Sequence, residues 1–271
     1  MKKHFSTIIL FLVFGIGLCL LLYPTVSDYW NSFHQSRAIA SYTDAVAQMD
    51  EKEYEKIWAD AVLFNDSLKK KSGNRYVLTE EERQWYNSLL NVSGSGVMGY
   101  IEIPSVDVSL ALYHGTEESV LQVAVGHIEG SSLPVGGEST HCVLSGHRGL
   151  PSARLFTDLD KLIEGDVFLL HILDETLTYE VDQILIVDPD SMEALEIMEG
   201  KDYCTLVTCT PYGVNSHRML VRGHRIENEL VANIRVTADA TRLDPIVVAP
   251  AIAIPILLIL LLWMLIKYRK R

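Results

Sequence analysis

The pattern of apolar and polar positions divides the chain into regions of different character. Nearly uninterrupted apolar runs cover 5–23 and 246–266, while the chain between them alternates between apolar and polar positions. At a rise of ~1.5 Å per residue, each run is about long enough to cross a hydrocarbon core of ~30 Å. We therefore predict a transmembrane anchor at 5–23 and a transmembrane helix at 246–266.

Basic residues orient these two predicted spans. Lys2 and Lys3 precede the first span and "KYRKR" follows the second, and such clusters stay on the cytoplasmic side. No small-residue cleavage motif follows 5–23, so we predict an uncleaved anchor rather than a removed signal peptide. The expected protein sits in the cell membrane with its main part outside. The remaining predicted regions are cytoplasmic tails at 1–4 and 267–271, an extracellular helical region at 24–90, a β domain at 91–230 and a linker at 231–245.

The helical region is predicted from two signals. Apolar positions between Ser36 and Lys71 recur at helical spacing, which indicates one or two amphipathic helices rising from the membrane. Thr79 and Glu82 then have the spacing of a capping box, so another helix should begin there and run through Leu90.

From Val97 onward the period changes to that of β-strands. Two strands broken at Pro104 come first, followed by a short helix and a glycine-rich loop over 117–137. The later strands are expected in "HCVLSGHRG", "GDVFLLHIL", "ETLTYEVDQILIVDP" and twice within 203–225, with short helices at "SARLFTDLDKL" and "SMEALEIMEG". Seven or eight strands in about 150 residues, separated by turn residues, predict a mostly-β barrel.

Charge narrows the function classes. Setting aside the six basic residues of the two tails leaves 17 basic residues against 35 acidic ones, a net charge of about −18. Such a surface repels phosphate backbones, which excludes nucleic acid as a partner.

Three residues at predicted strand ends carry candidate chemistry. Cys209 closes an apolar strand and is followed at once by "TPYG", a placement that favours an exposed nucleophile over a buried structural thiol. His147 ends the strand "VLSG", and an imidazole nearby could exchange a proton with the thiol. Arg218 opens the last strand, where its guanidinium could hold a substrate carbonyl or an oxyanion. We predict that Cys209, His147 and Arg218 meet at one rim of the barrel.

These residues lie in segments that resemble one family. "TLVTCTPYGVNSHRMLVRGHR" resembles the Thr-Leu-x-Thr-Cys signature of sortases with its downstream arginine strand, and "VLSGHRGLPSARLFTDLDKL" is similar to the sortase histidine segment. "GYIEIPSVDVSLALYHG" and "VGHIEGSSLPVGGESTH" resemble the opening strands and the glycine-rich loop, so the agreement covers about 86–226. The resemblance implies an eight-stranded sortase-type barrel and a transpeptidase that needs no metal or organic cofactor.

The resemblance also implies the roles of the three residues. Cys209 would attack the Thr–Gly bond of a Leu-Pro-x-Thr-Gly-like sorting signal, His147 would transfer protons, and Arg218 would position the signal and the oxyanion. A membrane segment after the barrel most resembles class C, the pilin-polymerising sortases, in which a lysine amine of a pilin subunit accepts the acyl group. The alternatives are a sortase that joins surface proteins to a peptidoglycan amine, a Cys/His hydrolase on the same residues, and a membrane-held structural or adhesin subunit. No sorting signal is found in this chain, which counts against the last.

Two further expectations follow from the resemblance. Many class C enzymes carry an Asp-Pro-aromatic lid before the barrel, but here that motif is absent, and in the possible lid segment 72–82 Tyr76 would insert instead. Cys142 and Cys204 each lie five residues before His147 and Cys209, so parallel neighbouring strands would place them within ~7 Å, close enough for a disulfide. An odd number of cysteines outside the first span leaves at least one thiol unpaired, and we favour buried free thiols at this pair over the bond.

Overall fold

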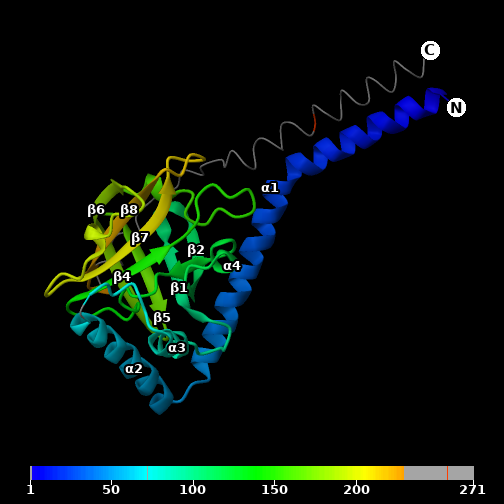
Figure 1. The fold of residues 1–271 in the computed structure, drawn as a ribbon. Coiled ribbons are helices and arrows are strands. Elements are labelled where there is room, and N and C mark those ends of the chain that lie inside the picture. Colours follow the sequence, from blue (N-terminus) through cyan, green and yellow to red (C-terminus); the bar gives the residue numbers. More distant parts are fainter. Residues whose placement is uncertain (1, 72, 229–254, 256–271) are drawn as a thin grey trace.

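The structure, a computed structural model, describes residues 2–71, 73–228 and 255, and shows a helical N-terminal part followed by a closed β-barrel (Figure 1). The predicted linker 231–245, second span 246–266 and tail 267–271 lie, apart from residue 255, outside the described residues. The helices are α1 (Lys2–Ala47), α2 (Glu51–Lys70), α3 (Glu80–Ser88) and α4 (Glu118–Leu121). The strands are β1 (Val97–Ile103), β2 (Val108–His114), β3 (Val125–His127), β4 (Thr140–Ser145), β5 (Val167–Ile172), β6 (Glu175–Val187), β7 (Asp202–Thr210) and β8 (His217–Ile226). Short 3₁₀ turns are η1 (Pro104–Val106), η2 (Leu159–Lys161) and η3 (Glu193–Leu195).

Helix α1 joins the predicted anchor to the first amphipathic helix without a break. It is 46 residues long and keeps Pro24 in its interior. Among the described residues, it is the one helix with a stretch, Ile9–Ala47, that is long and apolar enough to cross a membrane. It projects from the barrel at its N-terminal end and runs along the barrel's side at its other end (Figure 1).

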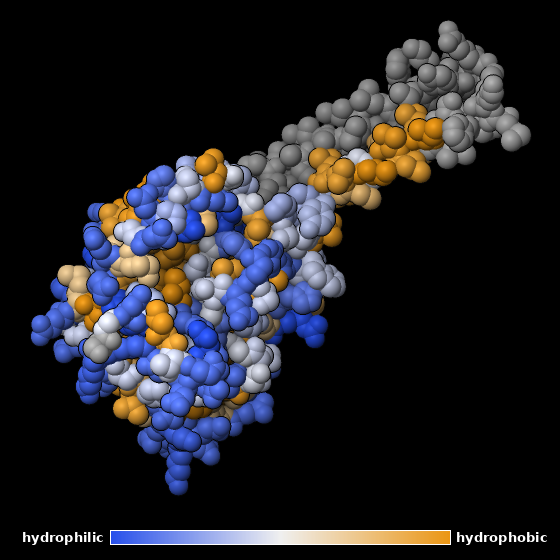
Figure 2. All heavy atoms as spheres, in the orientation of Figure 1, coloured by the Kyte–Doolittle hydropathy of each residue, from blue (hydrophilic) through white to orange (hydrophobic). Residues whose placement is uncertain are grey.

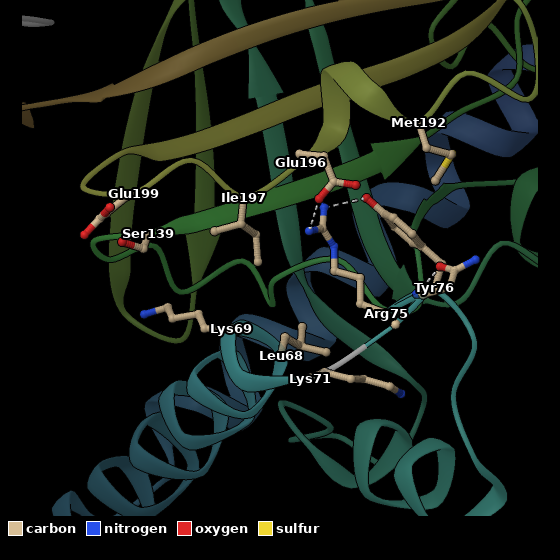
Figure 3. Close-up of a pocket in the computed structure, with 12 residues that line it drawn as sticks. Leu68, Lys69, Lys71, Arg75, Tyr76, Ser139, Met192, Glu196, Ile197 and Glu199 are labelled. Atoms are coloured by element: carbon tan, nitrogen blue, oxygen red, sulfur yellow. Dashed lines mark hydrogen bonds and ion pairs between the residues drawn. The ribbon is translucent and has the colours of Figure 1, made fainter.

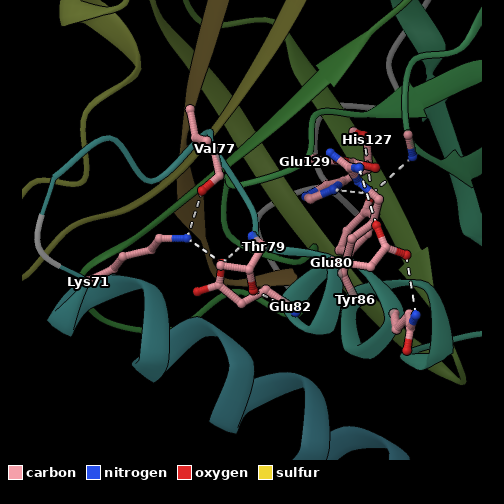
Figure 4. A network of polar contacts seen from close by, with 11 residues as sticks. Lys71, Val77, Thr79, Glu80, Glu82, Tyr86, His127 and Glu129 are labelled. Atoms are coloured by element: carbon pink, nitrogen blue, oxygen red, sulfur yellow. Dashed lines mark hydrogen bonds and ion pairs between the residues drawn. The ribbon is translucent and has the colours of Figure 1, made fainter.

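Helix α3 begins where the capping box predicts. The Thr79 hydroxyl accepts from the Glu82 amide at 3.2 Å, and the Glu82 carboxylate accepts from the Thr79 amide at 2.7 Å (Figure 4). The helix ends at Ser88, before the predicted end at Leu90, because Leu89 is already extended and Leu90 takes a positive φ of 55°. The buried Tyr86 hydroxyl bonds to His127 at 2.9 Å, which fixes α3 against the barrel (Figure 4).

The eight strands close in the order β1-β2-β3-β4-β7-β8-β6-β5, which confirms the predicted barrel. The pairs β2–β3 and β4–β7 are parallel and the other neighbours are antiparallel. Inward side chains such as Leu112, Phe168, Tyr179 and Leu206 are fully buried and fill the interior.

Three local predictions are wrong. The predicted helix over 152–162 is a series of turns with only η2 in helical form, because Leu155 takes a positive φ of 38° and the Phe156 amide donates to the His147 carbonyl at 3.1 Å. The glycine-rich stretch after α4 contains strand β3, where a Cβ on Gly126 would collide with the Gly115 carbonyl. "SMEALEIMEG" forms only the 3₁₀ turn η3.

Candidate active site

Cys209 lies at the end of β7, where the strand leaves the barrel. It is half-buried, while Thr208 and Thr210 on either side are buried. The Thr208 hydroxyl donates to the Gly146 carbonyl at 2.8 Å, which ties this end of β7 to the segment after β4. Beyond the cis Thr210–Pro211 bond the chain turns through Asn215, whose amide donates to the Pro211 carbonyl at 2.9 Å. The thiol is therefore presented by a fixed strand end under a tight turn.

His147 follows the neighbouring strand at the same level. In the parallel pair β4–β7, Ser145 is in register with Val207, and the Gly146 amide continues the pairing by donating to the Val207 carbonyl at 3.1 Å. His147 lies two residues after Ser145, and Cys209 lies two residues after Val207. The His147 side chain is 28% exposed, and its Nε2 lies 3.9 Å from the carboxylate of Glu118 on α4, which is too long for a hydrogen bond.

Arg218 is the register partner of Cys209 in the antiparallel pair β7–β8. Side chains directly opposite one another in such a pair have Cβ atoms roughly 4.5–5.5 Å apart and lie on the same face. The Arg218 guanidinium donates to the carbonyls of Asn215 and His217 at 3.3 and 3.1 Å, so it is held by the turn that follows Cys209. The fold thus brings the three predicted site residues to one end of β4, β7 and β8.

The other two arginines of β8 contact residues away from Cys209. Arg222 forms a two-point ion pair with Asp182 at 2.9 and 3.0 Å and lies over the Tyr203 ring at 4.2 Å. Arg225 lies over the Tyr179 ring at 5.7 Å. Arg218 is thus the one arginine of β8 at the rim.

Arg148 was missed by the sequence reasoning. Its side chain is only 9% exposed, although it sits next to His147 in the loop after β4. The guanidinium donates to the Thr210 hydroxyl at 3.4 Å, pairs with Asp160, and lies 6.0 Å from the centre of the Tyr212 ring. It therefore clamps the segment after His147 to the segment after Cys209, and no sequence signal separates it from a surface arginine.

Tyr76 lies in a strap, residues 73–78, that crosses the loop before β7. Its hydroxyl donates to the Leu195 carbonyl at 3.3 Å, and the Arg75 guanidinium stacks 4.9 Å from its ring while pairing with Glu196 at 2.8 Å (Figure 3). Burial raises the pKa of Tyr76. The strap also passes close over Gly130, where any side chain would collide with the Arg75 backbone.

Clefts lie on both sides of the strap. One of about 800 Å³ is lined by the end of α2 and residues 196–199 (Figure 3), and its lining includes none of the three predicted catalytic residues. The other, about 620 Å³, runs from Tyr76 and Met192 past Ile128 to Glu117, next to the Glu118 that faces His147. Beside it the outer face of β4, β7 and β8 carries the apolar residues Val143, Val207 and Leu220, packed with Leu195. The lining of the second cleft also includes none of the three predicted catalytic residues, but its end at Glu117 lies next to Glu118, which faces His147.

Cys142 and Cys204 are register partners in β4–β7, as predicted, and both are free thiols. Both side chains are buried, and burial raises the pKa of Cys204. Among the described residues, no group of three or more His, Cys, Asp or Glu side chains is arranged to hold a metal ion.

Comparison with known proteins places this geometry in a family. The Sortase domain family matches residues 101–226. Sortase C1 from Streptococcus agalactiae is 58% identical with a TM-score of 0.69, and the match covers 71% of this chain and 99% of that one. Sortase C from Streptococcus pneumoniae, in a structure described as giving insight into catalysis and pilin substrate specificity, is 45% identical with a TM-score of 0.63, covering 70% and 97%.

Two further relatives belong to the same family. Sortase C from Clostridium perfringens, solved with the C-terminal cell wall sorting motif, is 42% identical with a TM-score of 0.62, covering 71% of this chain and 99% of that one. Sortase D from Bacillus subtilis is 31% identical over 131 residues, which cover 47% of this chain and 63% of that relative. The chain belongs to the sortase family of cysteine transpeptidases, and three solved sortases C at 42–58% identity match it over 97–99% of their own length.

Proposed function

We propose that this chain polymerises pilins, joining a sorting-signal carbonyl to a lysine amine of another subunit. The observation that carries the proposal is the register of β4, β7 and β8, which puts Cys209 opposite Arg218 and level with His147. The relatives solved with a sorting motif and described for pilin specificity support the choice of substrates.

The first half-reaction forms a thioacyl-enzyme. His147 takes the proton of the Cys209 thiol, the sulfur attacks the carbonyl carbon of the signal's threonine, and the resulting oxyanion is stabilised by the Arg218 guanidinium. The C–N bond to glycine then breaks, and His147 gives its proton to the leaving amine. Because the thiol is held at a strand end and Arg218 by the adjacent turn, little reorganisation is needed as the charge develops.

The second half-reaction transfers the acyl group to the pilin. A lysine amine attacks the thioester carbon and His147 accepts its proton. The C–S bond then breaks, His147 returns the proton to the Cys209 sulfur, and the acyl group leaves as an isopeptide. An amine must compete with abundant water, so nucleophile, donor and acceptor have to be held together. A membrane anchor on α1 helps, because proteins that carry a sorting signal would be held at the same surface.

The test is product analysis with the full chain in detergent. A sorting-signal protein is supplied with a pilin that contains its lysine and, separately, with a peptidoglycan amine. Laddered oligomers are expected. Monomers joined only to the peptidoglycan amine would favour the anchoring reaction instead, and release of cleaved donor without dependence on acceptor would favour a hydrolase.

A further inference from the structure

Helix α1 carries two opposite faces beyond its apolar run. Asp28, Asn31 and Gln35 recur at helical spacing, as do the exposed side chains of the aromatic stripe, which we define as Tyr23, Val26, Tyr29, Trp30 and Phe33. At about 100° per residue, the centres of these two sets lie roughly 170° apart around the helix. One set therefore faces away from the other.

The polar face holds the barrel. The Asp28 carboxylate accepts from the Arg154 amide at 2.9 Å, and the Asn31 amide donates to the Ser152 carbonyl at 3.4 Å. Gln35 is 6% exposed, accepts from the Ala111 amide at 2.8 Å, and donates to the Val123 carbonyl. Two turns further, the Tyr42 hydroxyl donates to the Met98 carbonyl and accepts from the Leu173 amide. This half of α1 is thus a fixed part of the catalytic domain.

The side chains of the aromatic stripe are exposed in the described part of the structure. Trp30 is 65% exposed, Tyr29 73% and Phe33 48%, in a row of apolar groups that is uncommon on a soluble surface. The space-filling view shows apolar side chains continuing along the projecting helix to the barrel (Figure 2). Arg37 lies one turn beyond Phe33, with its guanidinium 5.8 Å from the Phe33 ring centre. The last residue on this face of the helix is therefore positively charged.

We propose that the aromatic stripe rests in the interfacial layer of the membrane, with α1 lying between lipid and barrel. The stripe continues directly from the apolar run that fits a membrane span. Trp and Tyr are the residues enriched at membrane–water interfaces, and a following arginine can reach lipid phosphates.

The bend in α1 makes this placement possible. From Tyr23 to Phe33 a straight helix rises about 15 Å, more than the roughly 5–8 Å of one interfacial layer, so a helix along the membrane normal would lift Phe33 into water. Pro24 lies inside α1, and proline inside a helix bends it. The helix changes direction before it runs along the barrel (Figure 1). The catalytic domain then sits about one helix diameter, ~10 Å, above the lipid.

The test measures contact between Trp30 and lipid in the full chain. The protein is reconstituted in phosphatidylcholine–phosphatidylglycerol vesicles with or without bromine on the acyl chains, which quenches nearby tryptophan. Bromine should reduce the tryptophan emission of the wild type more than that of Trp30→Phe. The matched control is Trp58→Phe, which changes a side chain that packs on the core and should lose as much emission to bromine as the wild type. This result does not depend on the transpeptidase chemistry.

Two outcomes would overturn the proposal. If Trp30→Phe loses as much emission to bromine as the wild type and aqueous acrylamide quenches Trp30, the stripe faces water. If neither bromine nor acrylamide reaches Trp30, protein covers the stripe, either residues 246–266 or a second copy of the chain.

Discussion

Two levels of the same strand pair, five residues apart, hold thiols in opposite states. At the inner level of β4–β7, Cys142 and Cys204 are register partners, buried and free, beside a His141 with both ring nitrogens bonded. At the rim, His147 follows the end of β4, and Cys209 lies next to the last residue of β7 and is half-exposed. Both levels hold a histidine and cysteine, so the difference in reactivity that we predict rests on burial and on the access that a strand end provides.

The sharpest test of this comparison replaces the thiols one at a time. Cys209→Ala should lower the rate of transpeptidation about 10⁴-fold or more, because the nucleophile is lost. Cys142→Ala is the matched control at the inner level and should keep the rate per folded molecule. Alkylation of the native protein should label Cys209 and spare the inner pair. A strong loss of activity in the Cys142 variant at unchanged stability would break the comparison.

The inner level should also respond to acid as a buried site. Burial lowers the pKa of His141 to about 4, so the unfolded chain binds a proton below about pH 6.5 that the folded chain does not bind until about pH 4. The resulting stability is present above pH 6.5 and lost as pH falls through that window, a change of about 3 kcal/mol. His141→Gln keeps a donor and an acceptor but cannot titrate, so denaturant unfolding should show a shallower decline between pH 6.5 and 4. Equal slopes for both proteins would contradict this assignment.

At the rim, Arg148→Met should separate positioning from binding. The variant removes the clamp between the segments after His147 and Cys209, and we expect kcat to fall up to about 10²-fold with a smaller change in KM. Arg148→Lys keeps the charge but not the forked geometry, and should recover part of kcat. Loss of stability with an unchanged kcat would make Arg148 a structural residue only.

The smallest expected effect concerns Gly146, which connects strand β4 to His147. A Cβ on Gly146 would lie 2.6 Å from the Phe156 ring, so Gly146→Ala should cost about 1–3 kcal/mol of stability and displace His147. Gly165→Ala, in an open turn with positive φ, is a control for backbone strain without a clash. Thermal unfolding measures the stability of both variants and turnover measures their activity. Only Gly146→Ala should lose activity.

Particular residues show how far sequence reasoning reached. Thr79 and Glu82 fixed the start of α3, since a capping box is a local hydrogen-bond pattern. The equal spacing of Cys142–His147 and Cys204–Cys209 correctly predicted the register of β4 and β7, once parallel pairing was taken from the family resemblance. The apolar period of 152–162, in contrast, predicted a helix that contacts with His147 and α1 prevent.

The sequence by itself determined the barrel, the long apolar run of α1 and the identity of the three residues at the rim, because strand period, apolar length and motif order are written locally along the chain. Only the tertiary structure decided that Arg148 is buried between two loops, that Tyr76 bonds to Leu195 and Arg75, and that α1 binds the barrel through Asp28, Asn31 and Gln35. Each of these depends on contacts between segments far apart in sequence, and a polar side chain gives no local sign of whether water or another segment will satisfy it.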